Sequence, residues 1–331
     1  MIELTRRAAL AGAGAAALMP LVKTAPASAA APIAERQNAS FYRYNVGTHQ
    51  VTVVCDGVST VNLPDTYVAN ATKDQVGKIL AESQLPADKV THTFSPIVVN
   101  TGSKLVVIDT GLGPDQFAQS KGRTGQFHAN LAAANLDRNA VDTVVISHFH
   151  GDHINGLLAA ENKAAFPNAE IMVPGAEWKF WMDDGEMSKG MGNPILENNF
   201  KNIRRVFDAL GRKVTQYEAG KEVAPGITSV ASPGHTPGHT SYVVASGSDK
   251  VLVQVDITAG AAFLFVKNPE WQFGSDVDKP LAVQTRRKLY DMAIAEKMPI
   301  QAYHAAFPGL VRVEKDGNGY RWIPAIWNAY L

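Results

Sequence analysis

The sequence contains a single cysteine, Cys55, in 331 residues. One cysteine cannot form an intrachain disulfide, and it excludes the thiolate clusters of structural zinc sites. A metal ion bound by this chain must therefore be held by nitrogen and oxygen atoms. Cys55 follows the apolar run VTVV and precedes an Asp-Gly turn, which predicts a small buried side chain.

An excess of charge of one sign is also absent. Lys and Arg number 31, Asp and Glu number 31, and neither sign forms a long run. This balance argues against a nucleic-acid surface or a basic membrane-binding face. Hydrophobic residues make up 46% of the chain, which is enough for a packed core. We expect a globular protein that acts on a small molecule, with no nucleic-acid partner and no stable membrane insertion.

The apolar stretch at residues 8–22 is too short and too weakly hydrophobic for a confident membrane span. Arg6-Arg7 precede it and a small-residue Ala-Ser-Ala site follows it. This order predicts a signal peptide, and the arginine pair resembles the twin-arginine export signal. An ordinary secretion signal and an uncleaved anchor are the alternatives. The expected layout is a signal peptide over 1–29, a linker over 30–40 and one domain over 41–331, in a protein exported to the periplasm or secreted.

No Gly/Ser-rich linker and no repeat of solenoid period interrupts the chain after residue 40. Short β-branched runs alternate with stretches of helical periodicity, which predicts a layered α/β domain. Residues 183–194 lack apolar periodicity and read as a mobile flap or a plain surface loop. The predicted helices cover residues 73–82, 127–136, 175–182, 199–210 and 284–295. The predicted strands lie within residues 41–58, 97–108, 143–146, 170–173, 241–245, 251–255 and 300–303.

The segment SHFHGDHINGL, residues 147–157, places three histidines and an aspartate directly after an apolar strand. In an extended segment His148 and His150 point to the same side, so both imidazoles can reach one ion. Asp152 and His153 belong to the following turn and can face a second ion. Imidazole and carboxylate suit zinc, and they also accept iron, cobalt or manganese.

A two-metal site needs further ligands, and three polar residues stand where apolar strands stop. His235 lies in the Pro-Gly-rich loop SPGHTPGHTS, Asp256 closes VLVQVD, and His304 closes IQAYH. The ends of strands are where α/β sheets assemble their sites. We therefore expect these three side chains to join the histidine-rich loop.

With these residues the chain resembles the metallo-β-lactamase superfamily, whose HxHxDH signature matches residues 148–153. The resemblance implies an αββα sandwich and catalytic roles for Asp152 and Asp256 beside a hydroxide that bridges two divalent ions, best matched by Zn²⁺. It assigns His148, His150 and His235 to one metal, Asp152, His153 and His304 to the other, and Asp256 to both.

Two further residues are expected to support the ligands. Asp109, in VVIDTGLG, is predicted to accept a proton from a ligand histidine and to fix its tautomer. His239, four residues after His235, is predicted to hydrogen-bond or pack beneath the loop. His49, His92 and His128 fall outside the matched motifs and are interpreted as ordinary surface or core histidines.

Within the superfamily the chain most resembles methyl parathion hydrolase and its lactonase and esterase relatives, through ASPGHTPGHTSYVV, AFPNAEI, KFW and YHAAFPG. This resemblance implies a hydrolase of lactones, aryl esters or aryl phosphotriesters, a possible homodimer, and a substrate-pocket role for Trp181, with core packing as the alternative. No general acid is assignable, although Tyr303 is a candidate. An acyl-homoserine lactonase and a non-enzymatic exported metal-binding or partner-binding protein are the competing hypotheses.

Overall fold

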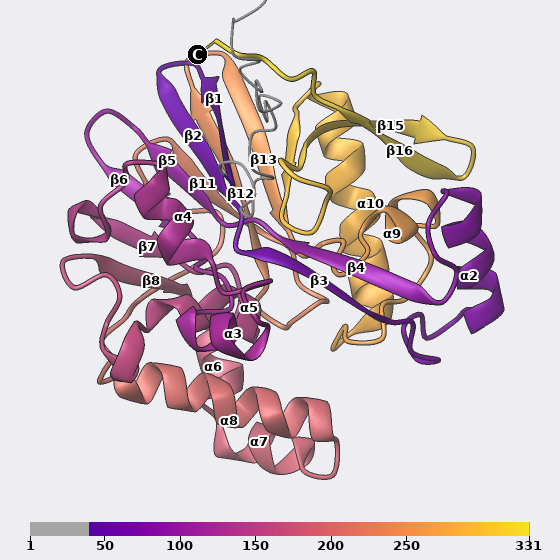
Figure 1. The fold of residues 1–331 in the computed structure, drawn as a ribbon, viewed down its shortest axis with the longest axis horizontal. Coiled ribbons are helices and arrows are strands. Elements are labelled where there is room, and N and C mark those ends of the chain that lie inside the picture. The colour runs from indigo at the N-terminus through magenta and orange to yellow at the C-terminus, as the bar shows by residue number, and fades with distance from the viewer. Residues whose placement is uncertain (1–39, 331) are drawn as a thin grey trace, which may run out of the picture. The chain divides into compact units, whose positions relative to one another are not determined.

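The computed structural model describes residues 40–330. The predicted signal peptide, residues 1–29, and the linker up to residue 39 lie outside the described residues. Two large β-sheets stack face to face in the described part, with helices on their outer surfaces (Figure 1). Among the described residues no helix is both long and apolar enough to cross a membrane.

The first sheet has seven strands in the order β1-β2-β5-β6-β7-β8-β9. Neighbours from β1 to β6 pair antiparallel, whereas β6 to β9 pair parallel. Parallel strands end at one edge of a sheet, so the chain leaves β6 and β7 on the same side of the layer. The bounds are β1 Phe41–Val46, β2 His49–Val54, β5 Ile97–Asn100, β6 Leu105–Ile108, β7 Thr143–Val145, β8 Glu170–Pro174 and β9 Thr215–Tyr217.

The second sheet also has seven strands, in the order β10 to β16, and only β13 and β14 pair parallel. A separate hairpin of β3 and β4 crosses beside the two sheets (Figure 1). The bounds are β10 Glu222–Ala224, β11 Ile227–Ala231, β12 Thr240–Ser246, β13 Asp249–Val255, β14 Ile300–Ala302, β15 Leu310–Asp316 and β16 Gly319–Pro324, with β3 Gly57–Asn62 and β4 Lys89–Phe94 in the hairpin.

Three apolar cores separate the layers. One lies between the first sheet and helices α4, α6 and α8, and includes Phe149, Phe207 and Trp181. A second fills the space between the sheets with β-branched residues such as Val53 and Val253. A third joins the second sheet to α10. Helix, sheet, sheet and helix therefore follow one another, which confirms the predicted αββα sandwich.

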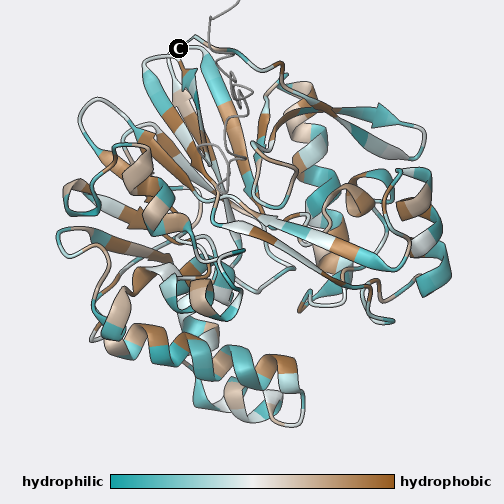
Figure 2. Ribbon diagram, in the orientation of Figure 1, coloured by the Kyte–Doolittle hydropathy of each residue, from teal (hydrophilic) through white to brown (hydrophobic). Residues whose placement is uncertain are grey.

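The helices show both polar and apolar colours, as expected for helices that bury one face against a sheet (Figure 2). Their bounds are α2 Lys73–Glu82, α3 Pro114–Gln119, α4 Phe127–Ala133, α5 Gly151–Ile154, α6 Gly175–Trp181, α7 Asp184–Gly190, α8 Pro194–Ala209, α9 Phe263–Lys267 and α10 Lys279–Ala295.

The prediction of a flap or loop over residues 183–194 is wrong. This segment contains α7 and the start of α8. The side chain of Asp183 accepts a hydrogen bond from the backbone of Glu186, and that of Asn193 accepts from Ile195, so each helix has an N-cap. Pro194 occupies the first turn of α8, where its missing N–H costs nothing. Asp183 and the Asn193-Pro194 pair are the sequence features that mark the starts of these two helices.

Candidate metal centre

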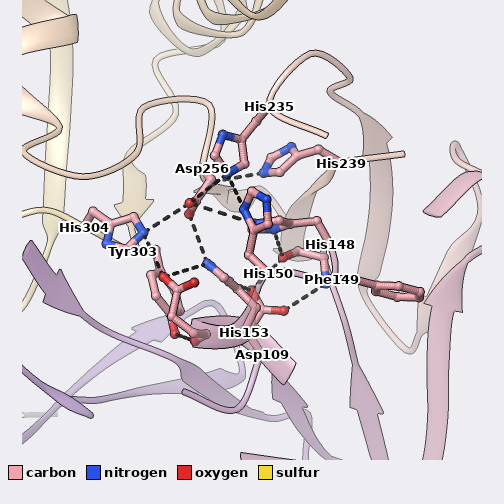
Figure 3. A network of polar contacts seen from close by, with 12 residues as sticks. Asp109, His148, Phe149, His150, His153, His235, His239, Asp256, Tyr303 and His304 are labelled. Carbon is pink, nitrogen blue, oxygen red and sulfur yellow. Dashed lines mark hydrogen bonds and ion pairs between the residues drawn. The ribbon is translucent and has the colours of Figure 1, made fainter. Parts of the chain in front are cut away.

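All seven predicted metal ligands converge where strands of the two sheets end (Figure 3). They come from two sides of the sandwich. Four follow β7 of the first sheet, and the other three belong to the second sheet, in the β11–β12 loop and after β13 and β14. The first group is His148, His150, Asp152 and His153, and the second is His235, Asp256 and His304.

His148, His150 and His235 form the first donor cluster. His148 Nε2 lies 3.2 Å from His150 Nδ1, which lies 2.9 Å from His235 Nε2. Burial lowers the pKa of His150 to about 3. Burial and the neighbouring His153 hold the pKa of His148 well below its usual value. These two rings are therefore neutral and offer lone pairs to a shared point.

Asp152, His153, Asp256 and His304 form the second donor cluster. Asp256 Oδ1 lies 3.4 Å from His153 Nε2. Its other oxygen, Oδ2, lies 3.1 Å from His304 Nε2 and 3.4 Å from His235 Nε2, which belongs to the first cluster. Asp256 therefore faces both clusters, as the bridging role predicted from the sequence requires.

The backbone before Asp256 is strained. Val255 has φ of 51°, an uncommon conformation for a β-branched residue. The pairing of β13 with β14 also shifts register between Val253 and Val255. Such strain is typical of functional sites, where the surrounding structure holds a side chain in place. Here it turns the Asp256 carboxylate between the two clusters.

Hydrogen bonds on the far side of the rings set the tautomers. His153 Nδ1 lies 2.8 Å from Asp109 Oδ2, and His304 Nδ1 lies 2.8 Å from the carbonyl of Thr93. Both oxygens only accept, so Nδ1 donates in each case. Nε2 is then the nitrogen whose lone pair is free to bind a cation.

The same logic fixes the tautomers of His148 and His235. Ser147 Oγ donates to Asp109 Oδ2 at 2.7 Å, so at 3.0 Å it accepts from His148 Nδ1. His235 Nδ1 donates to Asp276 Oδ1 at 2.7 Å. Asp109 therefore supports both clusters, and its role extends beyond the one ligand expected from the sequence.

The charges of the second cluster are coupled. Burial opposes a charge on His153, but Asp256, Asp152 and Asp109 outweigh it and raise the pKa of that ring well above its usual value. A bound cation would therefore take the place of the proton on Nε2. Burial likewise opposes the charge of Asp256, but His304 and His153 lower the pKa of its carboxyl well below its usual value. The carboxylate is thus kept anionic, the state that a cation requires.

The donor atoms fit metal ions. His153 Nε2 and Asp256 Oδ1 are buried and have no hydrogen-bond partner among the described residues, a situation that is costly unless another group satisfies them. In the first cluster, Nδ1 of the neutral His150 ring lies within 3.2 Å of Nε2 of both His148 and His235. Imidazole nitrogens and carboxylate oxygens are ligands of Zn²⁺ and related ions. Two groups of side chains can therefore each hold a divalent ion.

Two residues that hold the predicted metal ligands in place were not predicted from the sequence. Asp276 orients His235, but it stands in an irregular segment with no motif around it. Glu177 is fully buried in α6 and accepts hydrogen bonds from the backbone of Phe149 at 3.0 Å and of Gly238 at 2.7 Å. It ties the HxHxDH loop to the loop that carries His235. A helical glutamate gives no sign of such a role in the sequence.

The predicted pocket role of Trp181 is wrong. Trp181 is 0% exposed. Its indole N–H donates to Glu177 Oε2 at 2.7 Å, and its ring packs edge-on against Phe200. The alternative of core packing is the correct one. His239 does lie beneath the site, where its Nε2 accepts a hydrogen bond from the backbone N–H of Asp256 at 3.0 Å.

Tyr303 is engaged with the backbone. Its hydroxyl donates to the carbonyl of Asp152 at 2.5 Å, and its ring lies over that of His153 with centroids 4.2 Å apart. The side chain is 4% exposed. The Tyr303 proton is therefore committed to a main-chain oxygen, which argues against the general-acid role considered from the sequence.

A cavity of about 380 Å³ opens beside the two clusters, a size suited to a small ligand. Its apolar wall is formed by Phe94, Leu112 and Phe273. His92 also lines this cavity, so its interpretation as an ordinary histidine outside the site is wrong. The sequence did not reveal it because β4 reaches the site from the separate hairpin.

Comparisons with known proteins agree with this geometry. The family model of the metallo-beta-lactamase superfamily matches residues 95–258, a range that includes every predicted ligand except His304. The chain is 29% identical over 155 residues to an N-acyl homoserine lactonase of a Bacillus species, covering 46% of this chain and 52% of that protein. It is 28% identical over 183 residues to a probable metallo-hydrolase of Mycobacterium tuberculosis, covering 47% and 54%. The chain thus spans about half the length of these curated relatives.

Solved structures extend the likeness over most of the chain. AidC, a dizinc quorum-quenching lactonase, superposes with a TM-score of 0.79 at 23% identity, covering 87% of this chain and 98% of AidC. The hydrolase AbOPH of the beta-lactamase superfamily gives a TM-score of 0.77 at 26% identity, covering 88% and 100%.

The chain belongs to the metallo-β-lactamase superfamily, and the class of protein expected from the sequence is confirmed. The named relatives support the lactonase side of the resemblance; they do not single out methyl parathion hydrolase.

Proposed function

We propose that this chain is a dinuclear metal-dependent hydrolase that holds two zinc ions and cleaves lactones. The observation that carries the proposal is the pair of adjacent donor clusters that share Asp256 and open on a cavity of about 380 Å³. Iron, cobalt or manganese would fit the same nitrogen and oxygen donors.

Two bound divalent ions would supply water activated at neutral pH and polarisation of the carbonyl that is attacked. The chain's own residues prepare the site for them. Asp109, Asp276 and the Thr93 carbonyl hold ligand histidines in the tautomer with a free Nε2. Asp256 and Asp152 stay anionic, and apolar side chains form one wall of the cavity. No side-chain nucleophile is needed for such a reaction.

The relatives favour lactones among the possible substrates. Several curated relatives are named N-acyl homoserine lactonases, and AidC is named a quorum-quenching lactonase. An acyl-homoserine lactone is therefore the first substrate to test. Aryl esters and aryl phosphotriesters form the second group, because the same donor set and apolar wall would accept a carbonyl or phosphoryl oxygen.

The open cavity argues against a purely metal-binding role. A protein that only stored metal or bound a partner would have no need for a cavity next to intact ligands. Export by the twin-arginine route and homodimerisation complete the proposal, and they rest on residues 1–29 and on the family resemblance respectively.

The test is to compare kcat/KM of the zinc-loaded chain for N-hexanoyl homoserine lactone, an aromatic lactone and methyl paraoxon. The His148→Ala variant serves as the inactive control. We expect the lactones to be hydrolysed far faster than the phosphotriester. The reverse order would make phosphotriester cleavage the main activity, and no turnover of any substrate would reject the hydrolase proposal.

A further inference from the structure

The hydroxyl of Tyr67 is held beside the cavity. The backbone N–H of Ala261 donates to it at 2.6 Å, and the Tyr67 ring packs edge-on against Phe273, with centroids 5.4 Å apart. Gly260 has φ of +61°, and a Cβ there would lie 2.4 Å from the Tyr67 hydroxyl. The site of this hydroxyl therefore depends on a glycine next to it.

This hydroxyl lies 3.0 Å from His92 Nε2. The phenol oxygen already accepts from Ala261, and its proton has no other hydrogen-bond acceptor among the described residues. Tyr67 is 6% exposed, so an unused proton would be costly. The phenol therefore donates to His92, and Nε2 of that ring is the unprotonated nitrogen. The ring hydrogen then lies on Nδ1.

His92 Nδ1 is available to a ligand. His92 lines the cavity on β4 next to Thr93, whose carbonyl receives His304 Nδ1, and its ring lies edge-on to that of His304. Within residues 40–330, His92 Nδ1 has no hydrogen-bond partner, and it is not among the unpartnered polar atoms that are shielded from solvent. A ligand can therefore reach it. Burial, together with the nearby His304, lowers the pKa of His92 to about 4, which agrees with a neutral ring.

Few other side chains at the cavity can donate a hydrogen bond. Apart from the predicted metal ligands, its described lining is apolar or glycine except for His92 and Ser275. The carboxylates of Asp152 and Asp256 only accept. A carbonyl substrate brings acceptors to this cavity, and a neutral N–H suits them without adding charge beside the cations.

We infer that His92 is a substrate-binding residue that donates a neutral Nδ1–H hydrogen bond to an oxygen of the substrate, and that Tyr67 is a positioning residue that fixes this tautomer. The substrate half of the inference rests on the proposed hydrolase function. The tautomer half rests on the hydrogen bonds alone.

Two substitutions at His92 separate the ring nitrogens. An asparagine places its amide nitrogen near the position of Nδ1, whereas a glutamine places it near Nε2, facing Tyr67. We expect His92→Gln to lower kcat/KM for the best lactone about tenfold, the loss of one hydrogen bond, and His92→Asn to retain most of it. Zinc content should stay at the wild-type value in both. Equal activity of the two variants, or greater activity of His92→Gln, would overturn the inference.

Tyr67→Phe tests the positioning role. It should lower kcat/KM by less than His92→Gln does, because part of the His92 rings keep the Nδ1–H form. The double variant with His92→Gln should lose no more than His92→Gln alone, because both substitutions act on one contact. Tyr44→Phe is the matched control, since its phenol donates to Gln301 away from the site. Additive losses would show that Tyr67 acts through packing and not through His92, and would contradict its positioning role.

The tautomer can be read without any substrate. In ¹⁵N NMR of the zinc-loaded chain, His92 should show the Nδ1–H form, and Tyr67→Phe should mix the two forms. An Nε2–H form in the wild type would overturn the inference even in an active enzyme. If no substrate is turned over, the proposed function fails, but this spectrum still tests whether Tyr67 fixes the His92 tautomer.

Discussion

Asp109 illustrates how one residue can serve both donor clusters. Its Oδ2 accepts from His153 directly at 2.8 Å and reaches His148 through the hydroxyl of Ser147. Its backbone adopts φ of 61°, which carries the carboxylate under the HxHxDH loop. Orientation of metal-binding imidazoles by such partners commonly tunes metal affinity, so this single carboxylate controls the ring geometry of two ligands.

His148→Ala should remove the metal of the first cluster and nearly all hydrolysis while leaving the fold largely intact. The variant loses one of only three nitrogens that meet in that cluster. Metal analysis should show about one ion per chain in place of two, and circular dichroism should be unchanged. His49→Ala is a suitable control, because that histidine lies on β2 and outside both clusters. Wild-type turnover in His148→Ala would show that the site is misassigned.

Trp181→Ala should destabilise the protein rather than change its substrate preference. The indole is fully buried and donates to Glu177, so truncation leaves a cavity and an acceptor with one partner fewer. The expected loss in the free energy of unfolding is about 3–5 kcal/mol, measured by urea denaturation. Trp327→Ala, at a tryptophan that is 72% exposed, should change it little. A stable Trp181→Ala variant with altered substrate preference would restore the pocket role.

At this scale the sequence predicted which side chains converge, but it revealed few of the residues that support them. The ligands stand in a motif or at the ends of apolar strands, and both features are local. Asp276, Glu177 and His92 gain their roles from contacts between segments far apart in the chain, such as the 61 residues that separate Glu177 from Gly238. A local pattern carries no information on such contacts.

At the scale of secondary-structure elements, the predicted helix bounds were wrong where an N-cap starts a helix before its apolar periodicity begins. Helix α10 begins at Lys279 rather than at Gln284, because the side chain of Asp278 accepts from Leu281 and Pro280 lies in the first turn. The first residues of this helix lack strong apolar periodicity, as in α7. Helix α2, in contrast, was predicted with its observed bounds, and it has a capping box between Thr72 and Gln75.

Helix α4 connects to the metal loop through a histidine that should make stability depend on pH. His128 Nε2 donates to the carbonyl of Gly156 at 2.7 Å. Burial lowers its pKa from 6.5 to about 4. A histidine with a lowered folded pKa contributes stability that is complete above about pH 6.5 and is lost as the pH falls towards 4.

His128→Gln keeps a donor for Gly156 and removes the titration. Its free energy of unfolding should therefore fall less than that of the wild type between pH 7.5 and pH 5, by about 2 kcal/mol. Chemical denaturation of both proteins at the two pH values measures this difference. Parallel pH profiles would mean that His128 titrates normally in the folded protein.

For the whole molecule, the metal centre joins the two halves of the sandwich. The first sheet supplies the HxHxDH loop and the second supplies His235, Asp256 and His304. The layered architecture could be predicted from the alternation of strands and helices together with the motif. The pairing order of fourteen strands in two sheets could not, because it depends on which apolar faces meet in three dimensions.

Removal of the metals should therefore lower the stability of the whole domain. An ion that binds only the folded state stabilises it by RT ln(1 + [L]/Kd), about 4 kcal/mol at a thousandfold excess over Kd. Chelation should lower Tm by several degrees, and added Zn²⁺ should restore it, because the unpartnered His153 Nε2 and Asp256 Oδ1 regain a partner. His148→Ala, with its first cluster incomplete, should show a smaller shift. An unchanged Tm after proven loss of metal would mean that the sheets are held together by the apolar core between them, with the ions serving catalysis alone.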